Sequence, residues 1–253
     1  MELHQLEKEY TIHVYETGPD GRLALCSLFD FLQDSASEHA VKLGYGRDDL
    51  MRQNSFWVLS RMYTVISDLP GWNEKITVRT WPRGTDKIFA VRDYIVTYPD
   101  GRIIASATSS WLILNQLTRK ILRPDHTLVN YNINANSENS LLRNASRLEP
   151  ADPEGRIDSR FNVRISDLDI NHHTNNVRYL KWILDSYDLD FVMYNSPASV
   201  EINYLAESHY NEEIIIRTSE EKENRSLLFH SIFRSEDNKE LCRVRIVWKE
   251  KNT

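Results

Sequence analysis

The chain has 253 residues, 41% of them hydrophobic and 27% charged, with only eight glycines and eight prolines, so disordered, collagen-like and low-complexity chains are excluded. Its net charge of −6 argues against general nucleic-acid affinity, and its two cysteines cannot build a disulfide framework or a cysteine zinc site. No run reaches the roughly 18 apolar residues of a membrane span, and the N-terminus lacks a signal-peptide layout, so the sequence predicts a soluble, cytoplasmic protein.

The first half of the chain begins with a predicted strand at 9–15 and a turn at Gly18-Pro19-Asp20-Gly21. Apolar residues then recur every three or four positions and predict a helix from 25 to 43, which Gly44 ends. Four β-rich stretches follow, at 56–66, 75–81, 88–98 and 102–115. The sequence therefore predicts one strand, one helix and then four strands in this half.

The same order of elements returns after an asparagine-rich stretch at 124–155, which we expect to be a linker that wraps the surface. The predicted elements are a strand at 156–165, a helix at 175–187, and strands at 198–206, 212–218, 226–235 and 240–248. The sequence thus predicts two α+β domains, 1–123 and 156–253. In each, an antiparallel sheet curls around one apolar helix.

Positive charge is concentrated between Lys75 and Arg123, a stretch that contains nine basic residues and only three acidic ones. This stretch carries +6, so the rest of the chain carries −12. Two interpretations stay open: outward-facing side chains of a solvated sheet, or a surface that docks an anionic partner. The residues proposed for such a surface are Arg83, Lys87, Arg119 and Lys120.

The segment from Asp167 to Asn175 is the most polar connection in the second half, with two aspartates, two histidines and two asparagines before a predicted helix. A helix N-terminus presents unpaired N–H groups that suit an oxyanion. The alternative is a polar turn that only caps the helix. A metal site at His172-His173 is not expected, because adjacent side chains diverge and no third ligand follows at the usual spacing. Downstream, Glu207 ends a strand, and taken alone it would be a solvent-facing edge glutamate.

Together these residues resemble the acyl-acyl-carrier-protein thioesterases of plants and bacteria. Similarity is strongest at 167–186, which reads DLDINHHTNNVRYLKWILDS. Further matches are Leu32-Gln33-Asp34, Trp57 to Met62, and Asn115 to Lys120. The resemblance covers nearly the whole chain and implies a tandem double hotdog, in which each half is a long helix wrapped by an antiparallel sheet.

The resemblance also implies which residues act: Asp169, Asn171, His173 and Glu207 correspond to the family's catalytic positions. A carboxylate–histidine pair can take a proton from water, although which of His173 and Glu207 is the proximal base stays open. Asp169 would hold Asn171 or His173 in place, and backbone N–H groups near Asn175 and Asn176 are candidates for an oxyanion hole. Ser208 replaces the cysteine found in plant members, so we expect no thiol nucleophile, no metal and no cofactor.

The activity implied is hydrolysis of fatty acyl-acyl carrier protein to free fatty acid, which ends chain elongation. The expected partner is an acyl carrier protein with a phosphopantetheine-linked acyl chain, and the first half would supply the acyl pocket. Two alternatives are kept: an acyl-coenzyme A thioesterase, and a hotdog sensor that binds acyl thioesters without hydrolysis. The sequence leaves chain-length preference and oligomeric state open, with a homodimer as one option.

Overall fold

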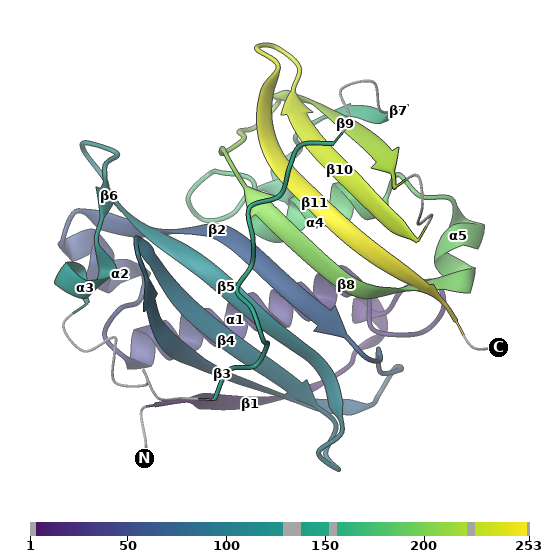
Figure 1. Ribbon diagram of the computed structural model, residues 1–253, viewed down its shortest axis with the longest axis horizontal. Coiled ribbons are helices and arrows are strands. Elements are labelled where there is room, and N and C mark those ends of the chain that lie inside the picture. The colour runs from purple at the N-terminus through teal and green to yellow at the C-terminus, as the bar shows by residue number, and fades with distance from the viewer. Residues whose placement is uncertain (1–3, 129–137, 152–155, 222–225, 252–253) are drawn as a thin grey trace. The chain divides into compact units, whose positions relative to one another are not determined.

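The computed structural model describes residues 4–128, 138–151, 156–221 and 226–251 (Figure 1). It divides into two compact units, Met1–Ala145 and Ser146–Thr253. Most of the asparagines of the expected linker, at 130, 132, 134 and 136, lie outside the described residues. In the part of the chain that is described, no helix is both long and apolar enough to cross a membrane.

Helix α1, Leu25–Lys42, is the core element of the first unit and lies across one face of its sheet (Figure 1). Leu28, Phe29 and Leu32 are almost fully buried, as their three- and four-residue spacing predicts. Each contributes about 1.5–3 kcal/mol by leaving water, and truncating Leu32 to alanine would cost about 2–5 kcal/mol. Gly44 ends the helix with a positive φ of 75° that favours glycine, so the predicted stop is confirmed.

The sheet of the first unit is antiparallel, in the order β1-β3-β4-β5-β2, with β6 paired to β5. Its strands are β1 Leu6–Thr11, β2 Ser55–Ile66, β3 Lys75–Asp86, β4 Phe89–Thr97, β5 Ile103–Asn115 and β6 Ile121–Leu122. The first strand ends earlier than predicted, because Val14–Glu16 form a 3-10 turn in which the Glu16 carboxylate accepts from the His13 N–H at 2.7 Å. Two short helices, α2 Arg47–Arg52 and α3 Pro124–Thr127, were not predicted.

The second unit repeats this strand order, as β7-β9-β10-β11-β8, again antiparallel. Its strands are β7 Arg156–Asn162, β8 Asn195–Tyr204, β9 Glu213–Glu220, β10 Leu227–Arg234 and β11 Lys239–Glu250. Each strand corresponds to the one in the same place of the first unit, so the repeated element order predicted from the sequence is confirmed.

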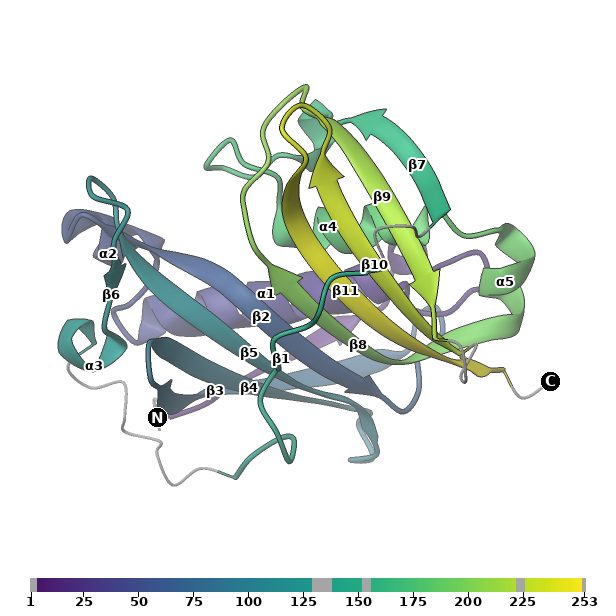
Figure 2. The ribbon, with the colours of Figure 1, turned by 45° about the horizontal axis from the view of Figure 1, so that its top comes forward.

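Helix α4, Asn176–Leu184, lies against one face of this sheet, behind β9, β10 and β11 in Figure 2. Val177, Leu180 and Ile183 are buried at helical spacing. The helix is shorter than the predicted 175–187, because the chain turns after Asp185 and begins a second short helix, α5 Leu189–Tyr194.

The connecting segment is fixed to each sheet by side-chain hydrogen bonds. In the first unit, Ser140 donates from its N–H to Asp93 at 2.9 Å and from its hydroxyl to the Ala107 carbonyl at 2.7 Å. In the second, the buried Glu201 carboxylate accepts from the Ser146 N–H at 2.6 Å, and Asn203 accepts from the Leu148 N–H at 2.8 Å. These bonds satisfy buried polar groups that the strand pattern alone would place in solvent.

Candidate active site

One carboxylate closes the loop between β7 and α4. Asp169 Oδ1 accepts from the backbone N–H of Asn171 at 2.7 Å and of His173 at 3.3 Å, and the Asp169 N–H donates to the His173 carbonyl at 2.8 Å. Its second oxygen accepts from the Asn171 side-chain amide at 3.3 Å. Asp169 therefore binds groups of both Asn171 and His173, where the sequence left open which of the two it would hold.

The segment that follows strand β8 brings Glu207 to His173. The Thr174 N–H donates to the Ser208 carbonyl at 3.0 Å, and His173 and His209 form an antiparallel bridge. As a result, His173 Nδ1 lies 3.5 Å from Glu207 Oε1, although the residues are 34 positions apart in the chain. Both side chains are partly accessible, at 27% and 36%, so water reaches the pair.

The serine that replaces the family's cysteine is a buried structural residue. Ser208 has no exposed surface, and its hydroxyl donates to Thr174 Oγ1 at 2.7 Å and lies 2.9 Å from the Tyr179 hydroxyl. Burial also raises the pKa of Cys242, which is fully enclosed and thus poorly nucleophilic. Cys26 lies in the other unit, in helix α1.

The two candidate oxyanion donors at the start of α4 differ in whether their N–H groups already have an acceptor. The Asn175 N–H donates to the Asp167 carbonyl at 2.9 Å, and its side chain caps the helix by accepting from the Val177 N–H at 2.9 Å. Asn175 is therefore an N-cap with an engaged N–H. For the Asn176 N–H, no acceptor occurs among the described residues. This group is the better candidate of the two.

Sequence reasoning did not select His209, which lies beside the pair. Its ring centroid is 5.0 Å from that of His173 in an edge-to-face arrangement, and its Nδ1 is 3.4 Å from Glu212 Oε1. The available signal was its position two residues after Glu207, since alternate residues of an extended chain share one side.

The first unit contains the same loop with different side chains. Its Gly18 N–H donates to the Arg22 carbonyl at 2.7 Å, as Asp169 does to His173, and its Leu23 N–H donates to the Pro70 carbonyl at 2.7 Å, as Thr174 does to Ser208. Bridges at Thr17 and Leu23 and at Leu168 and Thr174 correspond as well. The repeat thus extends to individual hydrogen bonds, but the first loop has glycine and arginine at the positions of Asp169 and His173, and Asp20 at the position of Asn171.

The basic residues between Lys75 and Arg123 do not share one environment. Arg83 was expected to be exposed and is not: its side chain is 13% accessible, pairs with Asp93 at 3.4 Å and donates to Asn144. Lys87, Arg119 and Lys120 are exposed. Strand register places their turns, β3–β4 and β5–β6, at the same end of the first sheet.

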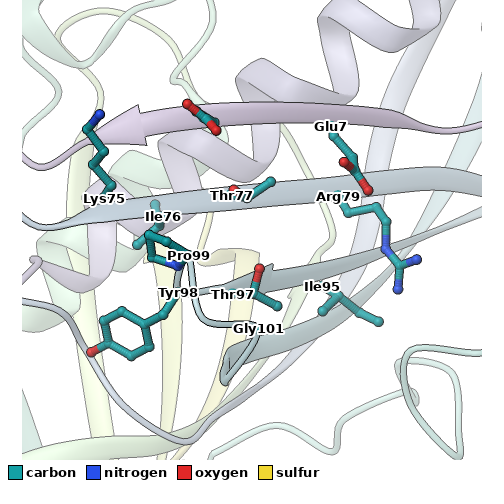
Figure 3. A pocket seen from close by; sticks show the side chains of 11 residues that line it. Glu7, Lys75, Ile76, Thr77, Arg79, Ile95, Thr97, Tyr98, Pro99 and Gly101 are labelled. Carbon is teal, nitrogen blue, oxygen red and sulfur yellow. The ribbon is translucent and has the colours of Figure 1, made fainter.

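A pocket of about 530 Å³ is lined by residues of β1, β3, β4 and the turn after β4 in the first unit (Figure 3). Glu7 and Glu9 line it together with Lys75 and Arg79, and Glu7 lies opposite Arg79 in the strand register. The two acids balance the two bases, so this pocket offers no net attraction for an anion. None of its residues belongs to the candidate catalytic set.

Two family models match the chain in order. The acyl-ACP thioesterase N-terminal domain matches residues 4–130, and the acyl-ACP thioesterase C-terminal domain matches residues 151–250. The chain belongs to the acyl-ACP thioesterase family. The resemblance predicted from the sequence motifs is therefore confirmed.

Individual relatives agree with this assignment. The chain is 27% identical to the chloroplastic palmitoyl-acyl carrier protein thioesterase of Gossypium hirsutum, over 97% of this chain and 64% of the relative. It is 25% identical to the chloroplastic oleoyl-acyl carrier protein thioesterase 2 of Arabidopsis thaliana, over 98% and 77%. The chain thus spans less than two thirds of the length of the cotton protein.

A solved acyl-ACP thioesterase from Bacteroides thetaiotaomicron VPI-5482 has the same fold. The TM-score is 0.88 at 26% identity, over 97% of this chain and 98% of the other. Together with the two matching strand orders, this confirms the predicted α+β tandem double hotdog.

Proposed function

We propose that the chain hydrolyses the thioester of fatty acyl-acyl carrier protein to free fatty acid and the carrier thiol. The observation that carries this proposal is the approach of His173 Nδ1 to Glu207 Oε1 at 3.5 Å, beside a loop that Asp169 holds in place. A partly accessible carboxylate–imidazole pair is suited to remove a proton from water.

In the proposed reaction, water attacks the thioester carbonyl carbon while Glu207 and His173 together take its proton. The carbonyl oxygen becomes an oxyanion, and the Asn176 N–H at the start of α4 is the backbone donor proposed to stabilise it. The Asn171 amide orients the water or the substrate. When the intermediate collapses, the carbon–sulfur bond breaks and the pantetheine thiolate leaves, taking back the proton that the pair removed.

The environments of Ser208 and Cys242 also favour water as the nucleophile, because neither side chain is available to attack the substrate. Ser208 is buried and engaged with Thr174, and burial raises the pKa of Cys242. Neither group is suited to attack a carbonyl carbon.

The two units are proposed to divide the work. The second unit has the hydrolytic residues, whereas the first has glycine and arginine at the positions of Asp169 and His173 and would supply the acyl pocket. The exposed Lys87, Arg119 and Lys120 of the first unit are proposed to attract the acidic carrier protein; Arg83 is excluded from this set by its ion pair. A homodimer and a cytoplasmic location stay predictions.

The test is release of free thiol from a series of acyl-acyl carrier proteins that differ in chain length and saturation, compared with the matching acyl-coenzyme A esters. Faster turnover of the carrier-linked series supports the proposal, and His173→Ala should remove it. Preference for coenzyme A esters would favour an acyl-coenzyme A thioesterase. Binding without turnover of either series would favour a sensor.

A further inference from the structure

Three side chains with metal-ligating atoms converge where the segment after strand β8 passes the loop that precedes α4. One such atom from each of His173, Glu207 and His209 lies within 4.8 Å of the other two. The sequence argued against a metal at His172-His173, because no third ligand follows at the usual spacing. The fold supplies two ligands from a segment more than 30 residues downstream instead.

The backbone explains why these three meet. His173 and His209 oppose each other across an antiparallel bridge, which places their side chains on one side, a few ångströms apart. Glu207 precedes His209 by two residues and shares that side. Glu207 and His209 therefore direct two ligands from one segment, and His173 directs a third from the neighbouring segment. Three such ligands leave the fourth position of a tetrahedral site open.

The surroundings of His209 are those of a metal ligand. Its Nδ1 lies 3.4 Å from Glu212 Oε1, and that carboxylate is held by Arg234 at 3.0 Å. Histidine ligands usually direct their second ring nitrogen to a carboxylate in this way, which orients the ring and increases its basicity. The His209 side chain is 50% accessible, so an ion can enter from solvent.

We propose that His173, Glu207 and His209 bind a divalent transition-metal ion of the Zn²⁺ type, and that the metal-bound protein does not hydrolyse thioesters. Two imidazoles and one carboxylate suit Zn²⁺, whereas Mg²⁺ and Ca²⁺ prefer oxygen ligands. The metal would occupy the lone pairs with which His173 and Glu207 remove a proton from water. Only this inhibition rests on the proposed function; metal binding does not.

The experiment measures metal binding and hydrolysis separately. The full chain, freed of metal by a chelator, is titrated with Zn²⁺ by calorimetry and with Co²⁺, whose visible absorption reports a tetrahedral site. Thiol release from acyl-acyl carrier protein is then followed with added Zn²⁺. We expect one bound ion per chain, loss of hydrolysis as the site fills, and recovery on chelation.

Variants outside the proposed hydrolytic set make the test specific. His209→Gln should keep the hydrolysis rate but lower the Zn²⁺ affinity by at least about 100-fold, and Glu212→Gln should lower it by about 10- to 100-fold. His172→Asn is the matched control: it removes the adjacent imidazole, tolerates the local φ of 62°, and should bind Zn²⁺ like the parent.

Three results would overturn the proposal: no binding of Zn²⁺ or Co²⁺, binding that His209→Gln leaves unchanged, or hydrolysis that increases with Zn²⁺. A chain that binds one ion through His209 but hydrolyses no thioester would support the metal site and refute the proposed function instead.

Discussion

Arg22 occupies in the first unit the position that His173 occupies in the second. The carbonyl groups of both residues accept the same loop hydrogen bond, from Gly18 at 2.7 Å and from Asp169 at 2.8 Å. In the first unit, however, the guanidinium donates to the Leu69 carbonyl at 2.7 Å and pairs with Asp68 at 3.3 Å. One backbone frame thus has a structural side chain in one unit and a candidate catalytic side chain in the other.

Arg22→Ala should leave the hydrolysis rate unchanged and lower the free energy of unfolding by no more than about 1 kcal/mol. The loss is small because the ion pair is about half accessible, at 52% and 45%, where solvent screens it. Turnover and urea unfolding measure the two effects, with His173→Ala as the control that loses rate. A large rate loss in Arg22→Ala would show that the first loop takes part in hydrolysis.

His173→Ala, Glu207→Ala and the double variant should lower the rate by similar factors, about 10²- to 10⁴-fold. The reason is that the pair, 3.5 Å apart, would share one proton transfer, and residues that act as a unit do not contribute additively. Single-turnover rates at saturating substrate are the measurement. Losses that multiply in the double variant would indicate independent roles.

Ser208→Ala, Cys26→Ser and Cys242→Ser should retain most of the activity. Ser208→Ala removes the hydrogen bond to Thr174 and should lower the free energy of unfolding by about 1–3 kcal/mol, because it leaves a buried partner unsatisfied. Mass spectrometry after rapid quenching should find no acyl group on any of the three. An acyl-enzyme trapped on one of them would refute attack by water.

Neutralising the exposed basic turns should raise KM for carrier-linked substrate, and the effect should shrink as salt increases. The variants that remove charge are Lys87→Asn and Arg119→Asn, because asparagine tolerates the positive φ values of 57° and 54° at these two positions. At the third position, Lys120→Glu reverses the charge. Hydrolysis of a short uncharged thioester should barely change.

Arg83→Gln is the matched control for this set. It breaks the ion pair with the buried Asp93 and should lower stability without a specific change in KM. If the variants at Lys87, Arg119 and Lys120 lose activity equally on carrier-linked and uncharged substrates, the turns matter for folding rather than for docking.

His230 is buried in the second unit within a chain of hydrogen bonds. Trp248 Nε1 lies 3.3 Å from the Tyr187 hydroxyl, which is 2.8 Å from His230 Nε2, and His230 Nδ1 is 2.7 Å from Thr218 Oγ1. Tyr187 can donate to Nε2 while Nδ1–H donates to Thr218, so the network suits a neutral imidazole. Burial, with Arg156 nearby, lowers the pKa of His230 from 6.5 to about 3.

Stability should therefore fall as the pH decreases from 6.5 towards 3. In that range the unfolded chain binds a proton at His230 that the folded chain does not, so folding loses about 1.4 kcal/mol per pH unit from this residue. Unfolding measured across this range should show a weaker pH dependence in His230→Gln. If NMR detects His230 protonation near pH 6 in the folded protein, the prediction is wrong.

Local patterns were sufficient for the main strands, for the two core helices and for the family, although not for the short helices α2, α3 and α5. The spacing of Leu28 and Leu32, the stop at Gly44 and the N-cap of α4 depend on residues within one or two helical turns, so they can be recognised without the fold. The polar motif from Asp167 to Asn175 can also be recognised from the sequence, because Asp169 binds residues only two and four positions away and the loop is therefore one continuous segment.

The family resemblance had already paired Glu207 with His173, but only the tertiary structure shows how they meet, adds His209 and decides which charges are exposed. Glu207 and His209 reach His173 through the backbone bond between Thr174 and Ser208, which no spacing in the chain encodes. Likewise, Arg83 and Lys87 are similar in sequence context, but only Lys87 lies in an exposed turn, whereas Arg83 packs against Asp93. Such contacts depend on strand register and on the connecting segment, which long-range packing determines and local sequence does not.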